Sequence, residues 1–187
     1  MQHTKGNYYH IYNRGIDKRP IFFNDDNYRY FIKLMQNNYK RYDISILVYC
    51  LIPNHFHILV RQNSEIAISR FVQSLNNAFV QGVNKQLNRK GTLYEGRTQA
   101  KLIDDEDYLM HVCRYIHLNP IKHNLVQNLS DWEFSNFQAC INGENDDLTD
   151  MKFIIELFGS RESYKEFVEE YIPTMEEMSK MKEFVLE

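Results

Sequence analysis

Pro-Asn-His-Phe-His-Ile-Leu-Val occupies residues 53–60 and directly follows the apolar run Ile-Ser-Ile-Leu-Val-Tyr-Cys-Leu-Ile at residues 44–52. The two runs predict a pair of buried strands joined at the Pro-Asn pair. Alternate residues of a strand share a face, so His55 and His57 should point one way and Phe56 the other. Two imidazoles side by side on a rigid strand supply half of a metal site. Two half-buried histidines with separate hydrogen-bond partners are the alternative.

Upstream of this pair, the sequence predicts one strand and one helix. Residues 8–12 are aromatic and β-prone, which favours a strand. Apolar residues then recur at helical spacing over residues 28–39, and Asn24 or Asp25 is a suitable cap for that helix.

Downstream, an apolar stripe over residues 68–87 predicts a longer helix that opens at Asn63 or Ser64. Residues 92–103 predict an irregular strand, and the acidic cluster after it suits the positive N-terminus of a third helix. Proline restricts the residue before it, so this helix should stop or kink near Asn119. The order strand, helix, strand, strand, helix, strand, helix describes an α+β fold with an antiparallel sheet between helices.

The last part of the chain differs from the rest in charge. Residues 1–124 contain 17 Lys and Arg against 10 Asp and Glu, whereas residues 125–187 contain 5 against 15. A basic body with an acidic tail favours a body that meets phosphate. Apolar residues at helical spacing and a capping-box pattern that starts at Thr174 predict helices in the tail. The sequence therefore divides into a domain at 1–140 and an acidic helical extension at 141–187.

Composition sets further limits on the class of protein. The 13 Tyr and 12 Phe suit a thick core or surfaces on which bases stack. No apolar run is long enough to span a membrane, and the three scattered cysteines form no Cys-x-x-Cys pattern. These features predict a cytoplasmic protein with reduced thiols.

A second informative stretch, Arg-Tyr-Ile-His-Leu-Asn-Pro at residues 114–120, places Tyr115 and Asn119 one helical turn apart. Alone, the pattern also fits a boundary tyrosine beside a helix-terminating asparagine. A tyrosine hydroxyl, with a pKa near ~10, is a poor nucleophile at neutral pH. A cation held by His55, His57 and the Asn119 oxygen would polarise a scissile phosphate. Attack by Tyr115 would then store the bond energy as a phosphotyrosine, so that a strand hydroxyl could reverse the step.

Four segments resemble the single-tyrosine, His-hydrophobic-His transposases of the IS200-like class, and most closely their repeat-associated branch. They are the two stretches at 53–60 and 114–120, Tyr-His-Ile-Tyr-Asn-Arg-Gly at 9–15, and Gly-Thr-Leu-Tyr-Glu-Gly-Arg at 91–97. The resemblance implies a ferredoxin-like fold, a divalent metal on His55 and His57, and Tyr115 as the nucleophile. Asn119 stands where the wider class often has a glutamine ligand. The implied substrate is single-stranded DNA beside a hairpin, cut to leave a 5′-phosphotyrosine and a free 3′-hydroxyl.

The ligand types and the basic residues extend this hypothesis. Two imidazoles and an amide oxygen accept Mg²⁺, Mn²⁺ or Zn²⁺, and an open octahedral site for phosphate favours Mg²⁺ or Mn²⁺. Tyr12 and Tyr94 are available to stack bases. The remaining histidines near the tyrosine, His111, His117 and His123, are interpreted as surface or supporting residues. The cations expected to clamp DNA phosphate are Arg14, Lys18, Arg19, Arg61, Arg97, Lys101, Arg114 and Lys122.

Two other functions stay open on the sequence. One is a non-catalytic DNA-hairpin binder or regulator, although such a protein would not need His55, His57, Tyr115 and Asn119 together. The other is a small metal-dependent hydrolase that uses only the two histidines, which leaves Tyr115 unexplained. The chain is also short for a β/α barrel of roughly 250 residues. Monomer and homodimer are both compatible with the sequence.

Overall fold

The computed structural model describes residues 5–143 and 147–172. Its centre is one sheet of four antiparallel strands in the order β2-β3-β1-β4. Helix α1 joins β1 to β2 and helix α2 joins β3 to β4, which gives a ferredoxin-like arrangement and confirms the predicted α+β fold. The bounds are β1 (Tyr8–Arg14), α1 (Asp25–Asn38), β2 (Ile44–Ile52), β3 (His55–Gln62), α2 (Ile68–Gln86) and β4 (Gln99–Ile103).

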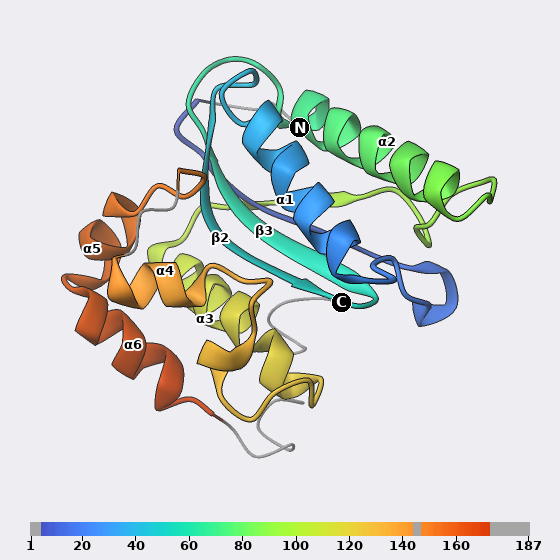
Figure 1. The fold of residues 1–187 in the computed structure, drawn as a ribbon. Coiled ribbons are helices and arrows are strands. Elements are labelled where there is room, and N and C mark those ends of the chain that lie inside the picture. The colour runs from blue at the N-terminus through green and yellow to red at the C-terminus, as the bar shows by residue number, and fades with distance from the viewer. Residues whose placement is uncertain (1–4, 144–146, 173–187) are drawn as a thin grey trace.

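Helices cover both faces of the sheet (Figure 1). α1 and α2 bury their apolar stripes on one face, in a first apolar cluster that contains Phe31, Phe56 and Phe79. The opposite face carries a second apolar cluster, which contains Val112 and Phe137. The helices on that face are α3 (Glu106–Lys122), α4 (Phe137–Asn142), α5 (Lys152–Phe158) and α6 (Arg161–Glu169), and short 3-10 helices lie at Ile16–Lys18 and Leu129–Asp131.

The alternation of β3 divides its residues between these two faces. Phe56 is fully buried in the first apolar cluster, whereas Leu59 belongs to the second. His55 and His57 share the face of Leu59, because residues two apart on a strand point the same way. The prediction that the two histidines face away from Phe56 is therefore confirmed, and they lie on the side covered by α3.

The edge of the sheet at β2 is covered by the segment that follows α3. The backbone of Leu51 donates to the carbonyl of Phe134 at 2.9 Å, and the indole of Trp132 donates to the carbonyl of Leu51 at 2.9 Å. The Asn136 amide accepts from the backbone of Tyr49 at 2.7 Å and donates to the backbone of Leu47 at 3.0 Å. An exposed edge strand invites pairing with another chain, so these contacts protect the sheet.

The predicted cap of α1 is confirmed, whereas the predicted start of α2 is wrong. Asn24 caps α1 by accepting a hydrogen bond from the backbone of Asn27 at 3.1 Å. α2 begins only after Ala67. The Ser64 hydroxyl accepts from the backbone of Ile66 at 3.3 Å, and this local turn competes with helix formation.

The predicted strand over 92–103 is regular only in β4, over Gln99–Ile103. The earlier part is a loop, fastened to β1 by an isolated bridge between Gly15 and Tyr94. The Asn13 amide holds the same loop by donating to the Thr98 hydroxyl at 2.7 Å.

The prediction that α3 stops or kinks near Asn119 is wrong, since the helix continues through Pro120 to Lys122. Proline has no N–H for the carbonyl four residues earlier, which here belongs to Ile116. The Asn119 side-chain amide donates to that carbonyl at 3.5 Å and to the carbonyl of Tyr115 at 2.9 Å. The side chain thus partly replaces the missing backbone hydrogen bond.

The described part of the C-terminal segment packs on the body. Phe153 and Ile154 of α5 and Tyr164 of α6 are buried in the second apolar cluster. The division into 1–140 and 141–187 stays a prediction, and the helix expected after Thr174 lies outside the described residues. Within the described residues, no helix is both long and apolar enough to cross a membrane.

This packing predicts that the C-terminal helices contribute to global stability. Ile154→Ala should lower the free energy of unfolding by about 2–5 kcal/mol, because it leaves a cavity in the second apolar cluster. The adjacent Ile155 is 44% exposed, so Ile155→Ala should change it by less than about 0.5 kcal/mol. Urea denaturation of both variants measures the difference. Equal effects would show that these helices unfold apart from the sheet.

Candidate active site

His55, the first candidate ligand, has both ring nitrogens directed at asparagine side chains. Its Nδ1 lies 2.8 Å from Oδ1 of Asn54, and its Nε2 lies 3.3 Å from Oδ1 of Asn119. Asn54 donates through Nδ2 to the backbone of Lys18, so its Oδ1 is an acceptor and Nδ1 of His55 carries the proton. In the neutral imidazole, Nε2 then presents a lone pair to Asn119.

Asn119 also presents a lone pair at this contact. Its Nδ2 is committed to the carbonyls of Tyr115 and Ile116, which leaves Oδ1 facing His55. With the ring neutral, two lone pairs face each other at 3.3 Å, and only a shared proton or metal cation makes the contact favourable. Adjacent ligands of an octahedral ion, each at about 2.1 Å, lie about 3 Å apart. The spacing of the pair therefore fits two neighbouring ligands of a divalent cation.

His57 is the third candidate ligand and lies at the next position on the same face of β3. Its ring centroid lies 5.0 Å from that of His55, and the two planes are nearly perpendicular at 86°. Its Nδ1 lies 3.0 Å from Nε2 of His10, whereas its Nε2 is buried and has no hydrogen-bond partner among the described residues. Burial first, and then the charges of His55 and other neighbours, hold the pKa of His57 well below its usual value. A neutral imidazole with a vacant lone pair is what a metal ligand requires.

We call His55, His57 and Asn119 the donor set. These three candidate ligands fit a divalent cation in a site that keeps open coordination positions. Within the described residues, no three His, Cys, Asp or Glu side chains gather to hold a metal, so a closed zinc site is not formed there. The unpartnered Nε2 of His57 and the facing atoms of His55 and Asn119 would instead supply three ligands. Such a site leaves positions for phosphate oxygens and water.

Tyr115 lies beside this donor set on α3. Its ring meets the His57 ring edge-on, with centroids 5.3 Å apart. The Lys122 ammonium donates to the Tyr115 hydroxyl at 3.2 Å and lies 4.5 Å from the ring centroid. The hydroxyl therefore has a positive charge next to it, although the side chain is only 3% exposed.

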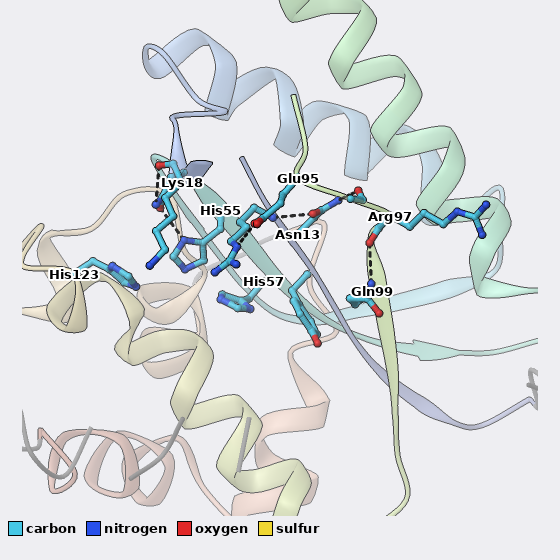
Figure 2. A pocket seen from close by; sticks show the side chains of 12 residues that line it. Asn13, Lys18, His55, His57, Glu95, Arg97, Gln99 and His123 are labelled. Carbon is cyan, nitrogen blue, oxygen red and sulfur yellow. Dashed lines mark hydrogen bonds and ion pairs between the residues drawn. The ribbon is translucent and has the colours of Figure 1, made fainter. Parts of the chain in front are cut away.

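A cavity of about 260 Å³ opens beside the two histidines (Figure 2). Its walls include the predicted cations Arg14, at the end of β1, Lys18, in the 3-10 helix that follows, and Arg97, in the loop before β4. Tyr115 and Asn119 are not among the side chains that line it. His57 thus lies between the cavity and the tyrosine.

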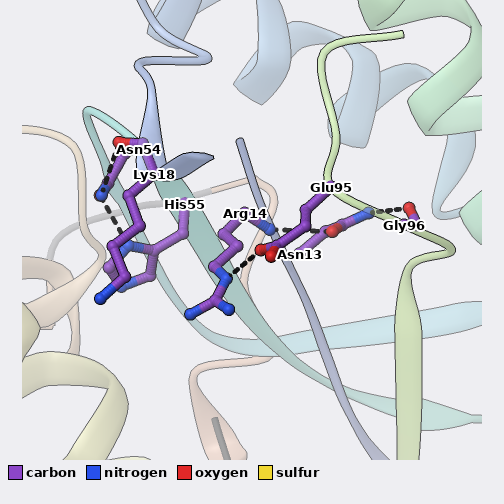
Figure 3. A network of polar contacts seen from close by, with 7 residues as sticks. All are labelled: Asn13, Arg14, Lys18, Asn54, His55, Glu95 and Gly96. Atoms are coloured by element: carbon purple, nitrogen blue, oxygen red, sulfur yellow. Dashed lines mark hydrogen bonds and ion pairs between the residues drawn. The ribbon is translucent and has the colours of Figure 1, made fainter. Parts of the chain in front are cut away.

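A polar network shapes one wall of this cavity (Figure 3). Arg14 pairs with Glu95, and the Arg14 hydrogen bond holds the pKa of that carboxyl below its usual value. Asn13 donates to the carbonyl of Gly96 at 3.2 Å. The network therefore ties the loop before β4 to the end of β1.

The structure does not gather all of the predicted DNA-binding cations. Arg61 pairs with Asp150 at 2.9 Å, and Lys101 donates to the Tyr108 hydroxyl at 3.1 Å. Arg114 is 8% exposed and lies over the rings of two aromatic residues of the C-terminal segment, Phe167 and Tyr171. Arg19 is largely exposed and lies 3.8 Å from Asp17, outside the cavity wall.

The three remaining predicted histidines occupy different environments. His123 lines the cavity, with its ring centroid 4.8 Å from that of His55. His111 contacts Arg114 at 2.8 Å. His117 is fully buried, where it contacts Oδ1 of Asn136 at 2.9 Å and the Tyr164 hydroxyl at 2.5 Å.

Sequence reasoning gave no role to His10, Asn54 or Glu95. His10 belongs to one of the four segments that carry the resemblance and has the same two-residue spacing from Tyr12 that His55 has from His57. Residues two apart on a strand share a face, so His10 lies on the same face as Tyr12. Only the pairing of β1 with β3 brings His10 to His57.

Comparison with known proteins identifies relatives in sequence and in fold. The family model described as transposase IS200 like matches residues 3–119. A Haemophilus influenzae protein named "Putative REP-associated tyrosine transposase" is 28% identical over 115 residues, which cover 56% of this chain and 65% of that protein. The matched part thus spans less than two thirds of that relative. The solved structure of a REP-associated tyrosine transposase bound to a REP hairpin has a similar fold, with a TM-score of 0.64 at 18% identity over 81% of this chain and 87% of that one.

The buried histidines predict an acid-sensitive fold. Burial lowers the pKa of His117 from 6.5 to about 4, against the opposing effect of its hydrogen bond to Asn136. Below pH 6.5 the unfolded state takes up a proton that the folded state refuses, so stability is lost as the pH falls. Between pH 7.5 and pH 5, this residue should cost about 2 kcal/mol of unfolding free energy.

Urea denaturation at the two pH values measures this loss. His117→Gln removes the titrating group, so the variant should lose about 2 kcal/mol less than the wild type over the same interval. Parallel losses in the two proteins would contradict the assignment of a neutral His117.

Proposed function

The chain belongs to the family of IS200-like transposases, and on that premise we propose that it cleaves and rejoins single-stranded DNA through a covalent bond to Tyr115. The observation that carries the proposal is the contact of the Tyr115 ring with His57, whose unpartnered Nε2 belongs to the metal donor set. A nucleophile and a phosphate-polarising site thus lie side by side. All residues with roles in this step lie within 1–140, which we assign as the catalytic unit.

In the proposed step, the Tyr115 oxygen attacks the phosphorus of a phosphodiester. A bond forms between the two atoms as the bond from phosphorus to the 3′-oxygen breaks. The phenolic proton passes to water, and the departing 3′-oxygen takes up a proton. The products are a 5′-phosphotyrosine and a 3′-hydroxyl, and attack by such a hydroxyl on the phosphotyrosine reverses the step without a nucleotide cofactor.

Lys122 assists this step from the same helix. Its ammonium donates to the attacking oxygen, so it stabilises the negative charge that develops as the proton leaves. It also fixes the direction of the oxygen lone pairs. Because Tyr115 is 3% exposed, binding of DNA must uncover the hydroxyl before attack.

A divalent cation, Mg²⁺ or Mn²⁺, would be held by His55, His57 and Asn119. Bound there, it would supply Lewis-acid stabilisation of the phosphate. Asn54 prepares His55 for this role by fixing its proton on Nδ1. The backbone carbonyls of α3 prepare Asn119 by directing its Oδ1 toward the site.

Single-stranded DNA next to a hairpin is the proposed substrate. A REP-associated tyrosine transposase of similar fold was solved with a REP hairpin, which supports this choice. The cavity beside the histidines adds Arg14, Lys18 and Arg97 for the phosphates and Tyr12 for stacking. Arg14 and Lys18 reach the cavity from β1 and the 3-10 helix that follows it, and Arg97 from the loop before β4.

Removal of the nucleophilic oxygen should abolish the covalent adduct. In Tyr115→Phe, the adduct with end-labelled single-stranded DNA and Mn²⁺ should fall by roughly 10³-fold or more. Affinity for the strand should stay within about twofold, because phosphate contacts dominate binding. A denaturing gel detects the adduct. Tyr108→Phe, on the same helix, is the control and should keep it; an adduct that persists in Tyr115→Phe would refute the assignment.

Loss of the Lys122 charge should slow attack more than it weakens binding. Lys122→Met should reduce the rate of adduct formation at saturating DNA by roughly 10²- to 10³-fold. The loss of one hydrogen-bond donor that stabilises developing negative charge has an effect of this size in other enzymes. Lys122→Arg keeps the charge and should recover most of the rate. A variant that changes only the dissociation constant for DNA would identify Lys122 as a phosphate contact instead.

A further inference from the structure

His10 is a buried polar residue that the proposed reaction does not use. It lies on β1 at 1% exposure, on the face of the sheet that carries His57. Its Nε2 contacts Nδ1 of His57 at 3.0 Å, and its Nδ1 is buried with no hydrogen-bond partner among the described residues. We propose that His10 is a positioning residue that holds His57 in the tautomer with its proton on Nδ1 and its lone pair on Nε2. This inference rests on the proposed metal site and extends it by one residue.

The geometry requires that the two imidazoles share one proton. A contact of 3.0 Å between two nitrogens is a hydrogen bond only if one of them donates and the other accepts. The ring planes are 26° apart and the centroids 5.1 Å apart, so the rings lie side by side in a fixed orientation. The register of β1 and β3, in which Tyr12 opposes His57, sets this position.

Two arrangements of protons satisfy this contact. In the first, Nδ1 of His57 donates to His10, and Nε2 of His57 has a lone pair for a cation. In the second, Nε2 of His10 donates to His57, and Nε2 of His57 carries a buried proton without an acceptor. Only the first allows His57 to bind a metal ion through Nε2. In the first, the buried proton without an acceptor is on Nδ1 of His10, so unpaired protons do not separate the two arrangements, whereas metal binding by His57 does.

The orientation and the metal affinity of a metal-binding histidine depend on the group that accepts a hydrogen bond from its second ring nitrogen. This group fixes the ring and its tautomer, and its loss costs metal affinity. For His55 the acceptor is Oδ1 of Asn54, which is in a neighbouring position of the chain. For His57 the acceptor is His10, from a different strand. Both proposed imidazole ligands are then oriented from behind by a side chain that does not itself contact the cation.

The tautomer of His57 is directly measurable in the full-length wild-type protein. A long-range ¹H–¹⁵N correlation spectrum of ¹⁵N-histidine-labelled protein, with and without Mg²⁺, distinguishes the two neutral forms. His57→Ala assigns the signals. We expect His57 protonated on Nδ1 when Mg²⁺ is present. Protonation on Nε2 under both conditions would overturn the inference without the need for a His10 variant.

Variants of His10 test whether the effect passes through His57. His10→Phe removes the acceptor and should weaken Mn²⁺ binding, measured by electron paramagnetic resonance of the free ion, by roughly 10- to 100-fold. His10→Gln places an amide oxygen near the position of Nε2 and should recover most of that loss. Circular dichroism and thermal melting verify that both variants are folded. An affinity of His10→Phe within twofold of the wild type would overturn the inference.

A double-mutant comparison separates this inference from the proposed function. In a His57→Ala background, His10→Phe should cause no further loss of Mn²⁺ affinity. A further loss would show that His10 acts other than through His57, against the inference. If the wild type itself bound no Mn²⁺, the metal site of the proposed function would be refuted. The tautomer of His57 would still decide the role of His10.

Discussion

The register between β1 and β3 determines where the polar groups of the site that lie on these two strands are placed. Tyr12 opposes His57 and Arg14 opposes His55, so the histidine pair, His10 and the cavity wall share one face. The other face of β3 carries Phe56 into the first apolar cluster. A slip of one residue would exchange these faces and bury the imidazoles among aromatic rings. Apolar packing around Phe56 therefore fixes the face of the sheet on which His55 and His57 lie.

Each polar group of the donor set is held by a neighbour that determines its orientation. Buried polar atoms are costly unless they are paired, so the pairing in such a site is informative. Asn54 holds the proton of His55, the α3 backbone holds the amide of Asn119, and Lys122 holds the hydroxyl of Tyr115. The unpaired nitrogen of His57 stands out against this background.

α3 is in turn supported from behind, where His117 contacts Tyr164 of α6. The acidic C-terminal segment thus supports the helix that carries Tyr115.

Much of the fold followed from local pattern, and the failures have identifiable causes. The strand pair, the order of elements and the cap at Asn24 were predictable, because periodicity and capping are local properties. The start of α2 was misplaced because the Ser64 turn competes with the helix. The end of α3 was misplaced because Asn119 contacts the carbonyl that Pro120 leaves unpaired. His10 and Arg114 were outside the reach of local pattern: strand pairing brings one to His57, and rings from a distant segment cover the other.

The central claim is that His55, His57 and Asn119 hold a divalent cation beside Tyr115. Anomalous X-ray diffraction from crystals of the protein soaked in Mn²⁺ tests it most directly. The claim predicts an anomalous peak at a bonding distance of about 2.0–2.3 Å from Nε2 of both histidines and Oδ1 of Asn119. A peak elsewhere, or none at this position while Nε2 of His57 pairs with another protein group, would contradict it.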